Sequence, residues 1–526
     1  MPMDVSGTST GSTMEEYNAY RRRESGVYVG RGTPPCPAHS ATNADMYGVG
    51  WFSPRETIGS LPDNVLLEIF GFYRLAVMRY RDYAWNWRIL VHVCSRWRQI
   101  ILASPHLLDL RLVCTDRTPA MEVLKAFPTL PIIINYLHNA TPLHHLSQNW
   151  GNIYIALGRR DQACWISLSR LTSFPLEVFV TMMQEPFPSL TFLELRSNDG
   201  NEIIQVLPDT FLGRSAPNLQ YLILQGVPFP TLPELLFSAN NLVSLHLADI
   251  PVIGYISAEA LAIGLSALPR LTWLIIRFSS PTPPPDRTYQ RLLPVTCAAL
   301  PSLTFLTFRG TTEYLEDLVA RISAPLLDLV NASFFDQLTF DVPQLFRSIG
   351  CSRKLRSPKR ATVSFYHGFA KIVFGPREGT AGPRHFSLRI LCGGSNRQVS
   401  SLTRICNQCL PLLSRVQRLD LKGGGCLQQG WHDDVNSAQW LELLRPFVAV
   451  ERLHISERLG PHVVPAFREL TGARATAMLP ALHSLFLEGL LPSVSASERE
   501  AIAPFMAARQ DSDRPIAILW GEWARV

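Results

Sequence analysis

The segment SAPNLQYLILQG (residues 215–226) holds the pattern that decides the fold of this chain. Its residues Leu219, Leu222 and Leu224 follow the order apolar-x-x-apolar-x-apolar, and the last part alternates as a β-strand with one buried face requires. Further copies occur at Leu190, Leu193, Leu195; Leu242, Leu245, Leu247; Leu271, Leu274, Ile276; Leu303, Leu306, Phe308; Val416, Leu419, Leu421; Val450, Leu453, Ile455; and Leu482, Leu485, Leu487. Successive copies are roughly 23 to 35 residues apart with one larger gap, which indicates a repeated structural unit.

Most copies follow a short apolar-proline pair. The pairs are Phe187-Pro188, Ala216-Pro217, Leu268-Pro269, Leu300-Pro301 and Leu479-Pro480. This regularity is typical of a leucine-rich-repeat solenoid, in which each unit lays one strand beside the last and covers it with a helix or turn. We therefore predict an α/β chain with an irregular leucine-rich-repeat-like solenoid of parallel strands over residues 187–526. Residues 111–186 are expected to form a linker of helix and strand with the first atypical repeats.

Three places depart from the repeat. Leu326, Leu329 and Asn331 break the third apolar position, and no clean copy occurs between about 351 and 400. In that gap, VSFYHGFAKIVF (363–374) and HFSLRILC (385–392) are expected to be strands of less typical units. The proline-rich segment SSPTPPPDR (279–287) is expected to be a surface loop.

Two apolar helices are predicted ahead of the repeats. In LPDNVLLEIFGFY (61–73), Pro62 suits a first helical turn, and Val65, Leu66, Ile69, Phe70 and Phe72 follow at helical spacing. A second helix is expected from Trp87 to Ala103, with the apolar positions Trp87, Ile89, Leu90, Val91, Val93, Cys94, Trp97, Ile100 and Ile101. A polar, aromatic insertion (74–86) separates them, and residues 1–56 are expected to be a disordered N-terminal tail.

This helical region, at 57–110, resembles an F-box, the short motif that docks onto the Skp-type adaptor of cullin-RING ubiquitin ligases. The resemblance rests on the opening Leu61-Pro62, the pair Ile69-Phe70, and Cys94 three positions before Trp97. It implies an adaptor-binding surface made of Leu61, Pro62, Val65, Leu66, Ile69, Phe70, Val93, Cys94, Trp97 and Ile100. The insertion at 74–86 is longer than in most F-boxes.

The order of segments after the F-box resembles the large set of F-box proteins encoded by mushroom-forming fungi. The segments that carry this resemblance include SPHLLDLRLVCTDRTP (104–119), PFPSLTFLEL (186–195) and SAPNLQYLILQG (215–226). The resemblance implies a substrate-recognition subunit of a Skp-cullin-F-box ligase, with an unknown substrate protein bound by the repeats. A repeat scaffold with a vestigial F-box and no ubiquitination role is the alternative. Both roles are non-enzymatic and require no cofactor or metal.

Composition limits the other classes of function. The chain of 526 residues is 47% apolar and only 17% charged, which excludes wholesale disorder. No segment is apolar over the ~20 residues that a membrane span needs, and the N-terminus lacks a signal-peptide core, so a cytoplasmic or nuclear protein is expected. The net charge of +6 makes nucleic acid an improbable partner.

Two local features have alternative readings. The cluster Arg353, Lys354, Arg356, Lys359, Arg360 within 352–360 is a solvated loop, a nuclear-import signal, or a contact for an acidic or phosphate-bearing partner. The C-x-x-C pair Cys406 and Cys409 lacks a second pair of ligands at zinc-site spacing, so buried structural thiols are predicted.

Overall fold

The computed structural model describes residues 58, 61–77, 87–137, 150–197, 206–281, 297–337, 340–376, 385–424, 435–489 and 496–521. The chain divides into two units, Met1–Pro62 and Asp63–Val526. Of the first unit, Ile58, Leu61 and Pro62 are described. The expected tail (1–56) and most of the insertion (78–86) and of the proline-rich loop (282–287) lie outside the described residues.

The second unit begins with three helices, α2 (Asp63–Val77), α3 (Trp87–Val91) and α4 (Ser95–Ala103). The expectation of one continuous helix from Trp87 to Ala103 is wrong, because the chain turns at 92–94. Cys94 is extended and its sulfur accepts a hydrogen bond from the backbone N–H of Trp97 at 3.5 Å, so it is the N-cap of α4. Ser104 ends α4 ahead of Pro105, as the restricted backbone before proline favours.

A 16-stranded sheet forms the main body of the described residues. In spatial order its strands are β1 (Leu112–Cys114), β2 (Ile132–Leu137), β3 (Ala163–Leu171), β4 (Phe192–Ser197), β5 (Tyr221–Gln225), β6 (Ser244–Ile250), β7 (Trp273–Phe278), β9 (Phe305–Gly310), β11 (Leu329–Phe334), β14 (His385–Leu391), β13 (Phe369–Gly375), β12 (Arg360–Tyr366), β15 (Arg418–Gly423), β16 (Arg452–Ile455), β17 (Ser484–Glu488) and β18 (Ala517–Gly521). The sheet continues through the expected boundary at 186/187, since β1–β3 pair in parallel with one another and with β4.

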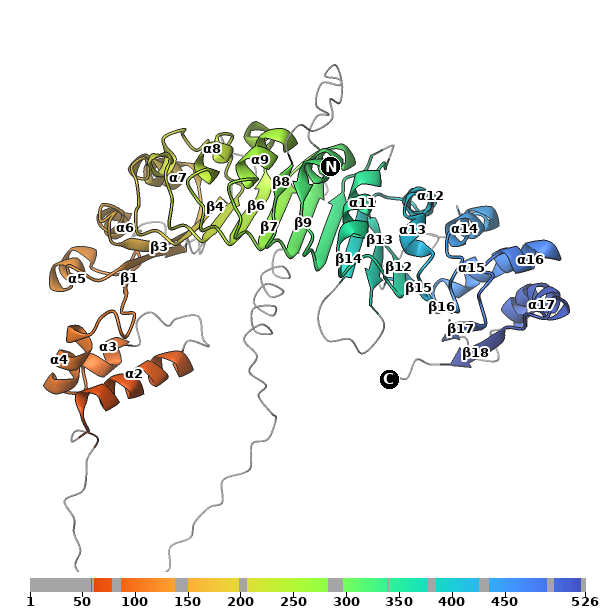
Figure 1. Ribbon diagram of the computed structural model, residues 1–526, viewed down its shortest axis with the longest axis horizontal. Helices are drawn as coiled ribbons and strands as arrows, with labels where there is room; N and C mark the ends of the chain where they lie inside the picture. Colours follow the sequence, from red (N-terminus) through yellow and green to blue (C-terminus); the bar gives the residue numbers. More distant parts are fainter. Residues whose placement is uncertain are drawn as a thin grey trace, which may run out of the picture. The chain divides into compact units, whose positions relative to one another are not determined.

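Helices follow most strands and lie along one face of this sheet (Figure 1). They are α5 (Ala120–Ala126), α6 (Trp150–Leu157), α7 (Ser173–Met182), η3 (Phe211–Arg214), α8 (Leu232–Leu236), η4 (Val252–Gly254), α9 (Ala258–Leu265), α10 (Thr312–Arg321), α11 (Pro343–Cys351), α12 (Ser395–Gln408), α13 (Leu410–Leu413), α14 (Ser437–Leu444), α15 (Gly460–Phe467), α16 (Ala473–Ala477) and α17 (Ala496–Asp511). A two-stranded parallel sheet, β8 (Ala298–Ala299) and β10 (Ile322–Ser323), lies outside the main one. This repeated strand–helix order confirms the mixed α/β, leucine-rich-repeat-like solenoid predicted from the pattern.

The apolar positions of the repeat form the core between sheet and helices. Every residue of the eight predicted copies is buried, and the most exposed, Leu247, reaches only 4%. In β7 the side chains alternate between half-buried and buried, so the apolar set lies on one face of the strand. At about 25 cal/mol per Å² of apolar surface, burial along this seam is the main stabilising term of the fold.

The apolar-proline pairs are tight turns that lead into the strands. The N–H of Leu190 donates to the carbonyl of Phe187 at 3.1 Å, and Leu219 donates to Ala216 in the same way. Proline is therefore at the second position of a four-residue turn, where its fixed φ is preorganised. Asparagine side chains join successive turns, because Nδ2 of Asn218 donates to the carbonyl of Pro188 at 2.8 Å.

The irregular copy expected at Leu326, Leu329 and Asn331 was assigned one residue out of register. The structure places Leu327, Val330 and Ala332 in the core, and pairs Val330 with Leu306 and Ala332 with Phe308. The copy is therefore complete, one residue later than Leu326, Leu329 and Asn331. Because residues 326, 327 and 329 are all leucines, the repeat pattern fits the sequence in either of two registers. A slip of one residue exchanges the two faces of a strand.

The atypical region does contain strands, but the expectation that all strands are parallel is wrong. β13 pairs antiparallel with both β12 and β14. These three strands enter the sheet in reverse order, so that β14 lies beside β11 and β12 lies beside β15. The turn at His367 and Gly368 joins β12 to β13 as a hairpin, which needs no crossover helix.

Candidate functional site

The first candidate site is the helical segment α2–α4. Leu66, Phe70 and Ile100 of the expected adaptor-binding set are buried in its interior. The ring of Phe70 meets the ring of Trp97 edge-on, with 4.7 Å between centroids. Packing of this kind holds α2 against α4 and adds roughly 1 kcal/mol to the burial of the rings. Leu66, Phe70 and Ile100 therefore belong to the packed core of the segment and are not on its surface.

The other seven residues of the set reach the surface of the chain. Val93 is 56% exposed, Pro62 and Cys94 are exposed, and four side chains are partly exposed: Leu61, Val65, Ile69 and Trp97. Cys94 also has the capping role at α4 described above, so its spacing from Trp97 has a local structural reason. The segment α2–α4 thus combines a packed interior with apolar side chains that reach the surface.

The sequence analysis did not predict which large apolar side chain of this segment is the most exposed. Phe72 is 70% exposed and Ile89 is also exposed, although both were expected on the apolar stripe. Phe72 lies two residues after Phe70, about 200° around the helix, so it cannot share the buried face with Phe70. Leu107, after α4, is exposed as well. The helical period, applied residue by residue, could have identified Phe72.

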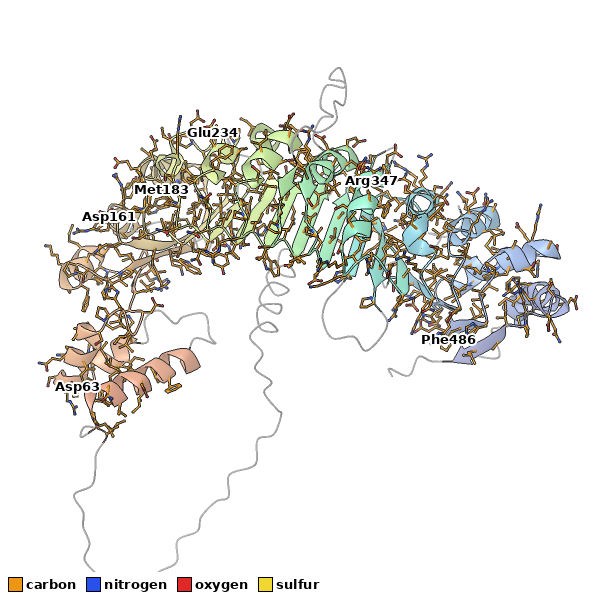
Figure 2. All side chains as sticks on the ribbon, viewed as in Figure 1. Asp63, Asp161, Met183, Glu234, Arg347 and Phe486 are labelled. Atoms are coloured by element: carbon orange, nitrogen blue, oxygen red, sulfur yellow. The ribbon has the colours of Figure 1, made fainter. Side chains whose placement is uncertain are left out.

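An ion pair joins the two longer helices of the segment. A carboxylate oxygen of Asp63, labelled at the start of α2 in Figure 2, lies 2.6 Å from a guanidinium nitrogen of Arg96 in α4. The Asp63 side chain is 65% exposed and that of Arg96 is 40% exposed, so the pair contributes at most about 1 kcal/mol. Its main effect is on the orientation of α2 and α4.

The second candidate site is the sheet face opposite the buried leucines. Two aromatic pairs lie on it: Trp165 stacks on Phe192 with 3.6 Å between centroids, and Trp273 stacks on Phe305 with 4.2 Å. The pairs span neighbouring strands because Trp165 is directly opposite Phe192, and Trp273 is directly opposite Phe305. Phe192 is buried, whereas Trp165, Trp273 and Phe305 are partly exposed, and aromatic side chains of this kind are frequent anchors of protein–protein interfaces.

A buried carboxylate organises the same face further along. Asp420 is 0% exposed, and its oxygens lie 2.5 Å from Nε of Arg360, 3.1 Å from Nε of Arg418 and 3.4 Å from Nδ1 of His454. The ring of His454 contacts the ring of Phe486, with 5.0 Å between centroids. Phe486 is labelled on β17 in Figure 2. Burial raises the pKa of Asp420, but His454 and the two guanidinium groups outweigh it and hold the pKa well below its ordinary value. The cluster ties β12, β15 and β16 together.

The comparisons with known proteins find likeness among solved structures but no match by sequence. No protein-family model and no curated protein matches the chain. The leucine-rich repeat-containing protein LegL7 from Legionella pneumophila is similar over 62% of this chain and 93% of its own, at 13% identity and a TM-score of 0.24. A likeness at this level supports no inference about the present chain, so the description as a repeat solenoid rests on the strand order and the buried repeat positions.

The structure gives the local surroundings of the basic cluster and of the C-x-x-C pair. Within the basic cluster, Lys354 pairs with Asp328 and Arg360 pairs with Asp420, while Arg353 and Arg356 are exposed. Cys406 and Cys409 are free and buried, and burial raises the pKa of the Cys409 thiol well above its ordinary value. Within the described residues, no helix has the length and apolar character needed to cross a bilayer.

Proposed function

We propose that this protein is a substrate-recognition subunit of a Skp-cullin-F-box ubiquitin ligase, working in the cytoplasm or nucleus. The segment α2–α4 binds the Skp-type adaptor and, through it, the cullin. The repeat solenoid binds the substrate protein. The observation that carries the proposal is the exposure of apolar side chains on α2–α4 and the turn before α4, where Val93 is exposed and Val65, Ile69 and Trp97 are partly exposed.

The physical basis is the formation of an interface around aromatic and apolar anchors. A standard protein–protein interface buries about 1,600 Å² in total, with a few anchors near its centre. Trp97 suits such an anchor because the ring of Phe70 packs edge-on against it and holds it in place. In this role the chain performs no covalent chemistry, and the rate of ubiquitin transfer rises because the substrate is held close to the ligase.

The first test is capture of the adaptor. The double variant Leu61→Ala/Pro62→Ala is expected to lose co-purification with a Skp-type adaptor. A sharper pair is Val93→Glu against Phe237→Glu, since the two side chains are similarly exposed, at 56% and 52%, and Phe237 follows α8 in the solenoid. Loss with Val93→Glu and retention with Phe237→Glu supports the proposal. Equal retention in both variants overturns it.

A second test separates the ligase from a scaffold with a vestigial F-box. Complexes captured through the adaptor are probed for cullin, and the half-life of co-purified proteins is measured with wild-type protein and with Val93→Glu. Cullin recruitment together with a half-life that lengthens in the variant supports the ligase. Adaptor binding without cullin, and with unchanged half-lives, favours the scaffold.

A further inference from the structure

Positively charged side chains form a row across the second candidate site, the sheet face opposite the buried leucines. Directly opposed positions on seven neighbouring strands, from β7 to β15, are occupied in order by Arg277, Arg309, Ser333, Arg389, Lys371, Ser364 and Lys422. Five of these seven positions are basic and the other two are serines. We call Arg277, Arg309, Arg389, Lys371 and Lys422 the basic row.

Arg309 lies in an unfavourable electrostatic position within the row. It lies directly opposite Arg277 and two strands from Arg389. Its guanidinium carbon is 5.3 Å from the centroid of the Phe335 ring, and its Nε is buried without a hydrogen-bond partner. Burial and the charges of Arg277 and Arg389 lower the pKa of Arg309, and Asp249 opposes this only in part.

At Arg277 and Arg309, the carboxylate of Asp249 offsets the positive charge only in part. Asp249 lies 3.8 Å from Arg277 and accepts a hydrogen bond from the amide of Gln225 at 2.9 Å. Like charges directly opposed on neighbouring strands destabilise a sheet, and a buried donor without a partner adds to that cost. Side chains that lower stability in this way are typical of binding sites, where the bound partner supplies the missing interactions.

We propose that the basic row binds a carboxylate-rich, extended segment of a partner protein. This inference deepens the solenoid half of the proposed function: it rests on the repeats binding a protein and is independent of the adaptor. The carboxylates of the segment accept hydrogen bonds from the guanidinium groups of Arg309 and its neighbours, in the two-pronged geometry that favours arginine over lysine.

The dimensions of the row set the length of this segment. Seven strands at ~4.8 Å spacing span about 29 Å, which an extended peptide covers in about nine residues at ~3.3 Å each. Trp273 and Phe305 stand on the same strands as Arg277 and Arg309, four residues earlier and on the same face, or about 13 Å away. An apolar residue outside the acidic stretch can therefore reach the aromatic pair.

The observations favour an acidic protein segment over nucleic acid. The row is a single line of charge, and Asp249 and Glu194 on the same face repel a continuous polyanion. The rings of Trp273 and Phe305 stack on each other, which leaves them less available to stack on bases. The net charge of the whole chain is only +6.

The test measures binding of a fluorescent peptide of nine glutamates to the full-length chain by anisotropy, at low and at physiological salt. Arg309→Glu/Arg389→Glu is compared with Arg353→Glu/Arg356→Glu, which changes the net charge equally within the exposed basic cluster. We expect the first variant to weaken binding about tenfold or more and the second to leave it within about twofold. A milder variant, Arg309→Gln, is expected to weaken binding while keeping or raising Tm, because it removes a repelled charge.

Several outcomes overturn the proposal. Equal loss in both double variants shows only a net-charge effect, and undiminished binding in the variant of the row shows that the row is not the site. Stronger binding of a single-stranded DNA of equal charge, lost with the same variant, assigns the row to nucleic acid. Adaptor capture is measured on every variant: its retention with Arg309→Glu/Arg389→Glu keeps this result separate from a failure of the proposed ligase role.

Discussion

The carboxylate of Glu316, in α10, accepts a hydrogen bond from the backbone N–H of Leu345, in α11, at 2.9 Å. Its second oxygen accepts from the N–H of Gln344 at 2.8 Å. Both N–H groups belong to the first turn of α11, where no intrahelical acceptor exists, and Pro343 at the first position has no N–H. One repeat therefore caps the helix of the next, with a buried negative charge at the positive end of the helix dipole.

This cap predicts a local loss of stability on mutation. Glu316→Ala leaves two N–H groups without their acceptor and should destabilise α11 by about 2 kcal/mol. Hydrogen exchange of the peptide covering 343–351 should then be about thirtyfold faster, since each 1.4 kcal/mol is a factor of about ten. The control is Asp317→Ala, the next residue, which is exposed and paired with Arg321. Similar exchange rates in the two variants would contradict the capping role.

The buried Asp420 predicts a pH dependence of stability. Its pKa in the folded chain is below the unfolded value of about 3.9. The stabilisation is therefore fully present above the unfolded pKa and is lost as the pH falls from about 4 toward the folded pKa. At pH 7, Asp420→Asn should lower stability by about 3 kcal/mol, because Arg360 and Arg418 lose their counter-charge.

The measurement for Asp420 is the urea midpoint of wild type and Asp420→Asn between pH 7 and pH 3. The gap between the two proteins should narrow as the pH falls. Asp161→Asn, at an exposed position, is the control and should differ little from wild type throughout. A gap that stays constant or widens toward low pH would show that the charge of Asp420 is not the stabilising feature.

Phe70 and Phe72 offer a matched pair on one helix. Phe70 is 1% exposed and packs on Trp97, whereas Phe72 is 70% exposed. Phe70→Ala should destabilise α2–α4 by about 3 kcal/mol through the cavity it leaves, and Phe72→Ala by less than about 0.5 kcal/mol. Limited proteolysis within residues 63–103 is the measurement, with faster cleavage expected only for Phe70→Ala. Equal cleavage in the two variants would contradict the packing of α2 against α4.

The cysteines predict a selective labelling pattern. Cys406 and Cys409 are buried, and the raised pKa of Cys409 keeps its thiol protonated and unreactive. Cys297 and Cys351 are exposed and should react with iodoacetamide at pH 8 within minutes, while Cys406 and Cys409 should react only after denaturation. Peptide mapping by mass spectrometry gives the pattern. A metal chelator should leave Tm unchanged, and a lowered Tm would instead indicate a metal at the C-x-x-C pair.

Periodicity predicted the solenoid because burial on one face of a strand leaves a pattern in consecutive residues. The same reasoning failed where two registers had equally apolar residues, as at Leu326 and Leu327. It also failed at 92–94, where Cys94 caps the start of α4 and the apolar stripe is divided between two helices. For the candidate site, the sequence indicated the helical segment, but packing determined that Phe70 lies inside it and Val93 outside.

Residues close together in the chain were enough to establish the repeat, its proline turns and the helical region ahead of it. Those features depend on the alternation and spacing of apolar side chains, which are local quantities. The reversed insertion of β12–β14, the ion cluster around Asp420 and the basic row depend on strands that pair across long separations. Arg277, Arg309 and Arg389 are far apart in the sequence and become neighbours only through sheet pairing, since hydrogen bonds between backbones align side chains that no local pattern relates.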